Sequence, residues 1–145
     1  MNQDIINKAA EIIERNCIKG GEYKGQICVL TLIDAEGFPT SSVIAPSKSD
    51  GINWITLCTS LDGNSAKRSA NCNRASICFG TSEYSINLVG EIEVVTSADV
   101  KREMWYDGCG EYFTSPDDPN HCVLRFTTKR YKFFVDGQEA EGRLS

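Results

Sequence analysis

From Tyr84 to Val94 the chain reads Tyr-Ser-Ile-Asn-Leu-Val-Gly-Glu-Ile-Glu-Val. Every second side chain from Tyr84 onward falls on one face, which is apolar except for Gly90, whereas serine, asparagine and glutamates fall on the other face. A period of two residues is typical of a β-strand with one buried face. We therefore predict a long antiparallel strand here, and we expect it to bend at Gly90, because glycine inside a strand marks a bulge or bend.

Shorter strand-like runs lie on both sides of this stretch. They cover about residues 27–33, 40–45, 52–59 and 75–79 before it, and 122–126 and 131–135 after it. Turn-forming residues such as Asp34–Pro39 and Ser49-Asp50-Gly51 separate several of them. Strands joined in hairpins with few helices between them favour a closed or split barrel over a doubly wound sheet. The predicted class is mainly β (α+β).

Three peripheral helices are predicted. The first covers about residues 2–16, because its isoleucines and alanine share one helical stripe, and Lys19-Gly20-Gly21 then breaks it. A second, short helix lies within residues 60–73, with a polar residue near its start as the cap. A third helix of about ten residues begins near Ser97 and stops at Gly108.

Length and charge limit the classes of partner. At 145 residues the chain has the size of one domain, so residues 1–145 are expected to form a single unit. Its net charge of -5 would repel a nucleic-acid backbone, and nucleic acid is therefore not an expected partner. Its apolar runs are far shorter than the ~20 residues that cross a bilayer, and no secretion signal is recognised. No membrane association is expected.

The seven cysteines form no Cys-x-x-Cys pair, and several lie inside apolar, strand-like runs. We interpret them as reduced, small hydrophobic residues of a cytoplasmic protein. His121 is the only histidine, and no clustered ligands with zinc-site spacing accompany it, so no metal is predicted.

Three patterns that superficially suggest chemistry are interpreted as structural. Gly108-Cys109-Gly110 follows a predicted helix rather than a strand and lacks the third glycine of a dinucleotide-binding motif. His121 and Cys122 are neighbours on a strand, so their side chains point to opposite faces and form no catalytic pair. Asp117 and Asp118 lie in a proline-rich segment that is typical of an exposed turn.

Residues 56–68 are the strongest candidate for binding chemistry. Hydroxyl groups, a strand end, the start of a helix, and the cations Lys67 and Arg68 occur together within this segment. A phosphate monoester needs such N–H and O–H donors with one or two cations, and a helix N-terminus adds amides and a positive dipole end. The alternative is that Lys67 and Arg68 only form a solvated helix face.

Several short motifs, in this order along the chain, resemble the pyridoxamine 5′-phosphate oxidase-like family and its general stress protein branch. They are Gly37-Phe38-Pro39 before a strand, Thr59-Ser60 with Ser65-Ala66-Lys67-Arg68, Asn71 to Cys78, Leu88 to Val94, Met104-Trp105 at a helix end, and Asp118 to Phe126. The resemblance extends over nearly the whole chain. The fold that it implies is a six-stranded antiparallel split β-barrel with peripheral helices.

The resemblance also implies a cofactor site. In this family FMN lies at the interface of a homodimer, with its ring against the second hairpin strand and its phosphate at the basic loop. Carried over to this sequence, the ring contacts are Ser41, Ser42 and Val43, the phosphate ligands are Thr59, Ser60, Ser65, Lys67 and Arg68, and a further cofactor contact is Trp105. Ser42 replaces an arginine of the oxidase branch, which removes one bidentate phosphate partner.

The function implied is that of an FMN-binding flavoprotein, an oxidoreductase whose substrate is unknown. Alternatives are a non-catalytic flavin-binding stress module and a split barrel that binds haem or a deazaflavin. Oxidation of pyridoxamine phosphate itself is not expected. In the oxidase branch a C-terminal extension rich in arginine and histidine supplies part of the substrate site, whereas this sequence ends at Gly142-Arg143-Leu144-Ser145 soon after the last predicted strand.

Overall fold

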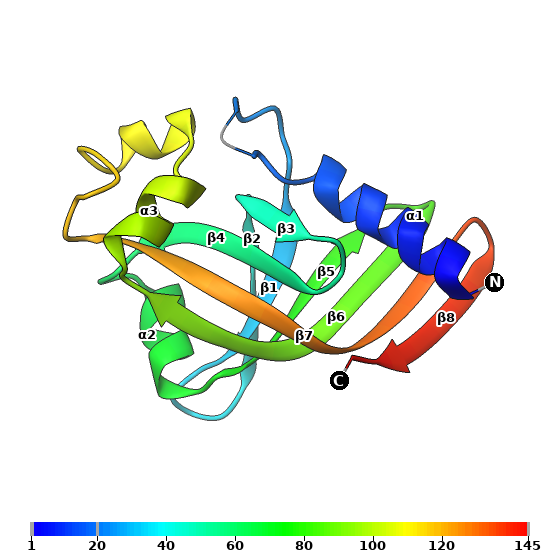
Figure 1. Cartoon of the computed structure of the whole chain (residues 1–145). Coiled ribbons are helices and arrows are strands. Elements are labelled where there is room, and N and C mark those ends of the chain that lie inside the picture. Colours follow the sequence, from blue (N-terminus) through cyan, green and yellow to red (C-terminus); the bar gives the residue numbers. More distant parts are fainter. Residues whose placement is uncertain (1, 20, 145) are drawn as a thin grey trace.

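A single antiparallel sheet organises the chain (Figure 1). The computed structural model describes residues 2–19 and 21–144. Within these residues the strands are β1 (Cys28–Ile33), β2 (Pro39–Ile44), β3 (Lys48–Asp50), β4 (Trp54–Ser60), β5 (Arg74–Gly80), β6 (Tyr84–Val95), β7 (His121–Val135) and β8 (Gln138–Arg143). The helices are α1 (Asn2–Arg15), α2 (Asn64–Asn71), α3 (Ala98–Met104) and the 3-10 helix η1 (Asp107–Glu111).

The long strands β6 and β7 form the centre of the sheet. The strand order is β2-β1-β5-β6-β7-β4-β3, and β8 pairs with the C-terminal half of β7. β7 can hold two different partners on one edge, because its first half pairs with β4 and its second half with β8. β2 lies at one end of this order, where among the described strands it pairs only with β1.

The predicted bend at Gly90 is confirmed as a bulge in the β6–β7 ladder. Val89 pairs with Arg130 whereas Gly90 pairs with Thr128, so Lys129 is the extra residue. A side chain at position 90 would overlap the backbone carbonyl of Thr127, which explains why glycine is required. The bulge shifts the inward-facing positions of β7 from even to odd numbers.

Two clusters of buried side chains form the core. The larger one fills the space between α1 and the inner face of the sheet; Leu30, Ile77 and Leu88 are fully buried members from neighbouring strands. The smaller one lies under α3 and η1 and contains Cys58, Met104, Cys109, Phe113 and Val123. Alternating burial along β1 and β5 follows from the side-chain period of two.

The predicted mainly β (α+β) class is confirmed, with three α-helices and one antiparallel sheet. The number of strands differs from the six implied by the resemblance, since the described residues form eight. The predicted segments 122–126 and 131–135 are one strand, β7, continuous through the bulge. The predicted polar tail forms β8, because Asp136 and Gly137 take positive φ angles of 52° and 75° and close a two-residue hairpin.

The helix boundaries also required correction. α2 begins at Asn64 after the N-cap residue Gly63, and no side chain among the described residues caps it. α3 ends at Met104, so it is shorter than predicted, and Gly108 lies inside the separate helix η1 rather than at the end of α3. Gly20, part of the predicted break after the first helix, and Ser145 lie outside the described residues.

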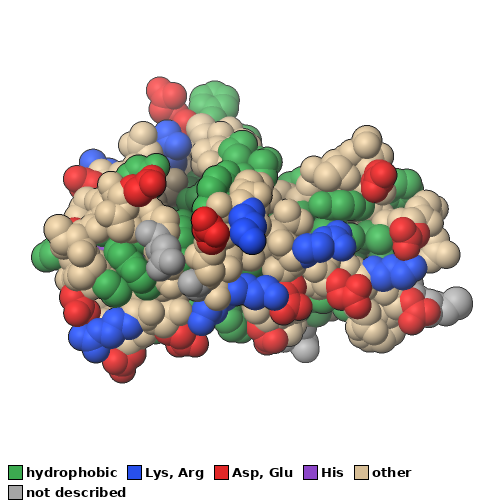
Figure 2. Space-filling view, turned by 90° about the horizontal axis from the view of Figure 1, so that it is seen from above, with side chains coloured by type: hydrophobic (Ala, Val, Ile, Leu, Met, Phe, Trp, Pro, Cys, Tyr) green, Lys and Arg blue, Asp and Glu red, His purple; other side chains and the backbone are tan. Residues whose placement is uncertain are grey.

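Charges of both signs are mixed on the surface. Figure 2 shows lysine and arginine side chains interspersed with aspartate and glutamate over the face seen from above, with hydrophobic atoms between them. Among the described residues, Lys8 pairs with Asp136 at 2.7 Å and Lys19 with Glu14 at 2.9 Å. No helix of the described part of the chain is long and apolar enough to cross a bilayer.

Candidate functional site

The predicted ring contacts lie on β2, the strand at one end of the sheet order. Ser41 is paired with Thr31, and their hydroxyl oxygens are 2.8 Å apart. Ser41 and Val43 share one face of the strand, whereas Ser42 faces the other side, since neighbouring side chains of a strand alternate. The three residues therefore cannot all present side chains to one side of a ring. Val43 is 64% exposed and offers the largest apolar contact of the three.

The predicted hydroxyl ligands lie where β4 leads into α2. Thr59 and Ser60 are the last residues of β4 and pair with Cys122 and His121. The connection is fixed by Asn120, whose backbone carbonyl accepts from the Leu61 amide at 2.7 Å. The Asn120 side-chain oxygen accepts from the Asp62 amide at 3.2 Å. Ser65 is in the first turn of α2, so this tight connection brings hydroxyls close to an uncapped helix N-terminus.

Lys67 and Arg68 lie on the side of α2 that faces the turn between β1 and β2. They line a hollow of about 510 Å³ together with Asn64, Asn71 and the turn residues Asp34, Ala35 and Glu36. No ion pair within 4.0 Å joins either cation to these carboxylates among the described residues. None of the predicted hydroxyl ligands lines this hollow, so the two cations lie along one side of α2, where acidic groups of the turn share their surroundings.

Trp105, the remaining predicted cofactor contact, packs partly inside the molecule. Its ring meets the His121 ring edge-on at a centroid distance of 5.2 Å and lies 6.4 Å from that of Phe113. His121 itself is completely buried, and its Nδ1 is 3.0 Å from the Pro116 carbonyl oxygen, which must accept the hydrogen bond. His121 is therefore a buried residue and not a surface one.

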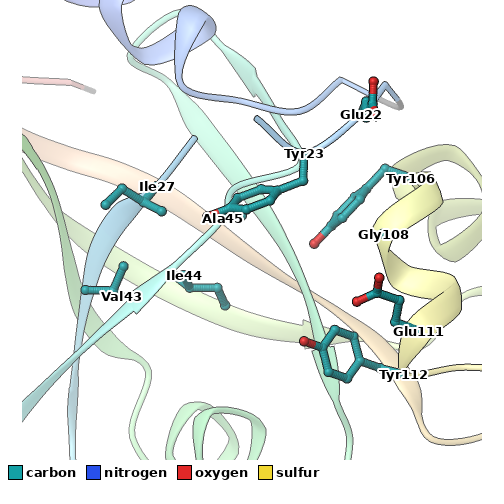
Figure 3. Close-up of a pocket in the computed structure, with 10 residues that line it drawn as sticks. All are labelled: Glu22, Tyr23, Ile27, Val43, Ile44, Ala45, Tyr106, Gly108, Glu111 and Tyr112. Atoms are coloured by element: carbon teal, nitrogen blue, oxygen red, sulfur yellow. The ribbon is translucent and has the colours of Figure 1, made fainter. Parts of the chain in front are cut away.

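A larger cavity lies between β2, the segment before β1, and η1 (Figure 3). Its volume is about 630 Å³. Its floor is the end of β2, and its walls carry three tyrosine rings. The lining residues are Glu22, Tyr23, Ile27, Val43, Ile44, Ala45, Tyr106, Gly108, Glu111 and Tyr112. Of the nine cofactor contacts predicted from the sequence, Val43 lines this cavity.

Two thiols and a phenol meet behind the η1 wall of this cavity. The hydrogen bond between the two thiols raises the pKa of Cys58, as does burial. The same bond lowers the pKa of Cys109 to about 7. Burial and the neighbouring Cys109 raise the pKa of Tyr106, so this side chain stays a neutral phenol at physiological pH. All seven cysteines are free thiols in this structure, and five of them are buried.

The three tyrosines were not predicted from the sequence as site residues. Tyr106 and Tyr112 bracket the glycine-containing helix η1, and Tyr23 lies in the irregular segment before β1. Such segments have no periodicity from which facing side chains can be inferred. The one available signal was a pair of aromatic residues that flank a Gly-Cys-Gly turn.

An antiparallel sheet with this strand order and peripheral helices defines the class of split-barrel proteins. The chain belongs to the pyridoxamine 5′-phosphate oxidase family, whose model matches residues 22–134. This match includes β2, the β4–α2 connection and η1, so it covers every part of the candidate site, whereas α1 and β8 lie outside it. No curated protein sequence matches the chain.

Solved structures support the same fold. A protein related to general stress protein 26, from Clostridium acetobutylicum, is 20% identical with a TM-score of 0.81, covering 99% of this chain and 97% of that one. General stress protein 26 from Bacillus anthracis is 17% identical with a TM-score of 0.71, covering 93% and 98%. A heme binding protein from Mycobacterium smegmatis is also 17% identical with a TM-score of 0.71, covering 95% of this chain and 57% of that one.

Proposed function

We propose that this protein is an FMN-binding flavoprotein of the general stress protein type, with an oxidoreductase role. The observation that carries the proposal is the β4–α2 connection, where a strand ending in two hydroxyls leads into a helix whose N-terminus no described side chain caps. Unpartnered amides at a helix start bind phosphate through hydrogen bonds and the positive end of the helix dipole. The phosphate ligands expected there are Thr59, Ser60, Ser65, Lys67 and Arg68.

The other end of the candidate site suits a ring system. Val43 exposes apolar surface on β2, and the cavity beside it lies within the range of about 300–1,000 Å³ that is usual for small-molecule sites. Bound FMN would supply hydride or single-electron chemistry. The residues of the chain would bind and orient it, with β2 against the ring and the α2 N-terminus at the phosphate.

We also propose that the protein is a homodimer. On the sheet face opposite the main core, strand register aligns Val43, Val29, Cys78 and Asn87 in one row. A parallel row contains Ser41, Thr31, Ser76 and Val89. These side chains are uncharged, and all are half-buried or exposed in the single chain. On β7 the rows continue into Lys132 and Arg130, so the uncharged face is limited to β2, β1, β5 and β6. An uncharged face of this extent next to the proposed ring site is suited to pack against a second copy.

The proposal is tested by the absorbance spectrum and stoichiometry of the purified protein after incubation with FMN, FAD, haem or a deazaflavin. One flavin per chain, with a shifted flavin spectrum for FMN, is the expected result. Retention of FAD or deazaflavin in preference to FMN would contradict the cofactor assignment. Failure to bind any flavin would contradict the proposed function.

Haem is the second candidate, and a structural neighbour named as a heme binding protein motivates it. The likeness to that protein is one of fold. In this chain the sole histidine is buried among aromatic rings and is not part of the cavity lining. An axial histidine is therefore not supplied at the cavity, which favours flavin over haem. A Soret band with one haem per chain, together with no FMN binding, would favour haem over flavin.

A further inference from the structure

We propose that the cavity between β2 and η1 binds a planar aromatic cation as the substrate of this site and discriminates against aromatic anions. The inference rests on the proposed function in one respect, because Val43 belongs both to the proposed flavin contact and to the cavity lining. The remaining steps depend only on the residues of the cavity.

The walls of the cavity are suited to a flat ligand. Figure 3 shows the rings of Tyr23, Tyr106 and Tyr112 around the same open space, with the Glu111 carboxylate between Tyr106 and Tyr112. Tyr23 is 52% exposed and Tyr112 is 78% exposed, so large aromatic surfaces remain uncovered here. Aromatic side chains from separate segments offer ring faces for stacking at low conformational cost.

The charges in the cavity all have one sign. The ionisable lining residues are Glu22, Glu111 and the three tyrosines, and none of the ten lining residues is lysine, arginine or histidine. Since burial raises the pKa of Tyr106, its phenol stays neutral, and its hydroxyl is hydrogen-bonded to Cys109. The carboxylates and the aromatic ring faces both attract a cation. The carboxylates repel an anion, and the ring faces do not attract it.

The candidate phosphate end has the opposite character. There Lys67 and Arg68 provide positive charge, and the helix start provides amides. The two ends therefore select different groups: the α2 end accepts a phosphate, and the tyrosine cavity accepts a cation. A substrate that itself carried a phosphate would meet Glu111 without a compensating cation, which argues against a phosphorylated substrate in this cavity.

Three matched probes test the inference: 1-methylnicotinamide, methylated on the ring nitrogen, as the cation, nicotinamide as the neutral ring and nicotinate as the anion. Their dissociation constants are measured by calorimetry, with the protein alone and with the protein saturated with FMN. The expected order of affinity is cation, neutral, anion. Equal or tighter binding of nicotinate would overturn the inference.

Variants at the cavity identify the source of the preference. Glu111→Gln should weaken binding of the cation about two- to fivefold and leave nicotinamide binding unchanged, since an exposed charge contact contributes about 0.5–1 kcal/mol. Tyr112→Ala should weaken both probes. Glu139→Gln, an exposed glutamate on β8, is the control and should change neither. An unaltered cation preference in Glu111→Gln would contradict the assignment.

The same samples separate the two proposals. FMN binding by Glu111→Gln at the parent affinity, with the cation preference reduced, supports both. Cation binding at the cavity by a protein that never binds FMN would overturn the proposed function and leave the ligand class of the cavity supported. FMN binding without any preference for the cation would support the proposed function and overturn the ligand class inferred for the cavity.

Discussion

At the scale of single residues, the proposed recognition of the phosphate depends on two cations that have carboxylate groups as neighbours. Lys67 and Arg68 share their hollow with Asp34 and Glu36. A bound phosphate would have to attract them more strongly than these carboxylates do. Charge-assisted hydrogen bonds to a phosphate are short and strong, so that outcome is physically reasonable when the helix start contributes as well.

The double variant Lys67→Ala/Arg68→Ala is predicted to weaken FMN by roughly 2 to 4 kcal/mol. Riboflavin, which lacks the phosphate, should bind the variant and the parent equally. Both affinities follow from quenching of flavin fluorescence, with Arg15→Ala, an exposed cation on α1, as the control. Unchanged FMN affinity would place the phosphate elsewhere, and equal weakening of both flavins would indicate a disturbed fold or dimer.

His121 predicts how stability depends on pH. Burial lowers the pKa of its imidazole below the ordinary value of 6.5, because the charged ring would lose its water. Nε2 has no hydrogen-bond partner among the described residues, so a proton there would be buried and unpaired. The unfolded chain therefore takes up the proton first as the pH falls. The free energy of unfolding should decrease as the pH falls below 6.5. Above this pH the Cys109 thiol, whose pKa is lowered to about 7 in the folded chain, adds a separate decrease as the pH falls toward 7.

Chemical unfolding between pH 8 and 5 measures this effect directly. The chain has one histidine, and carboxyl groups titrate mostly below this range, so the part of the decrease that belongs to His121 is identified by comparison with His121→Phe, which keeps the Cys109 thiol. His121→Phe should be less stable at pH 8, because the bond to the Pro116 carbonyl is lost, and it should show a flatter profile down to pH 5. An equally steep profile in the variant would mean that another group is responsible.

At the scale of elements, the bulge explains both a success and a failure of sequence-based prediction. The period of two predicted β6 and its irregularity at Gly90 correctly, because every position obeys one register. β7 was predicted as two strands, since Lys129 is the extra residue and the buried positions change from even to odd numbers there. Only pairing with β6 shows that the backbone continues.

The candidate site also has one part that could be predicted from the sequence and one part that could not. The β4–α2 connection is local in sequence, so its hydroxyls and cations could be placed together before the structure was considered. The tyrosine cavity joins residues 22–27, 43–45 and 106–112, which come together only through tertiary packing. No local sequence pattern indicates that these segments lie close together, so this part of the site could not be predicted from the sequence.

Gly90→Ala is the matching prediction for the β6–β7 ladder. A Cβ atom there would overlap the Thr127 carbonyl and lie 3.1 Å from the Lys129 amide nitrogen, and both obstacles are backbone. We expect a loss of about 1–3 kcal/mol in the free energy of unfolding, measured by urea titration. Gly110→Ala is the control, because its Cβ would meet open space and should change stability little. Comparable effects of the two substitutions would contradict the packing argument.

At the scale of the whole molecule, a single chain leaves functional surface uncovered. Tyr23, Val43 and Tyr112 are exposed around one cavity. The sheet face that carries Val29 and Cys78 has no charge in its two aligned rows from β2 to β6, and the charges begin on β7. Exposed apolar surface of this kind usually indicates an interaction site. The proposed ring contact on β2 lies at the border of that face, so assembly and cofactor binding are expected to depend on each other.

Light scattering at micromolar concentration is predicted to give twice the chain mass of 16.0 kDa.

Val29→Glu introduces a charge on the uncharged face, where it would be desolvated without a partner, and should shift the protein toward the monomer. Because the proposed flavin site lies at the same interface, FMN affinity should fall with the dimer fraction. Circular dichroism should confirm that the variant is folded. A parent protein that is monomeric with FMN present would contradict the dimer and the two-subunit flavin site together, whereas a folded monomeric variant with full FMN affinity would confine the flavin to one chain.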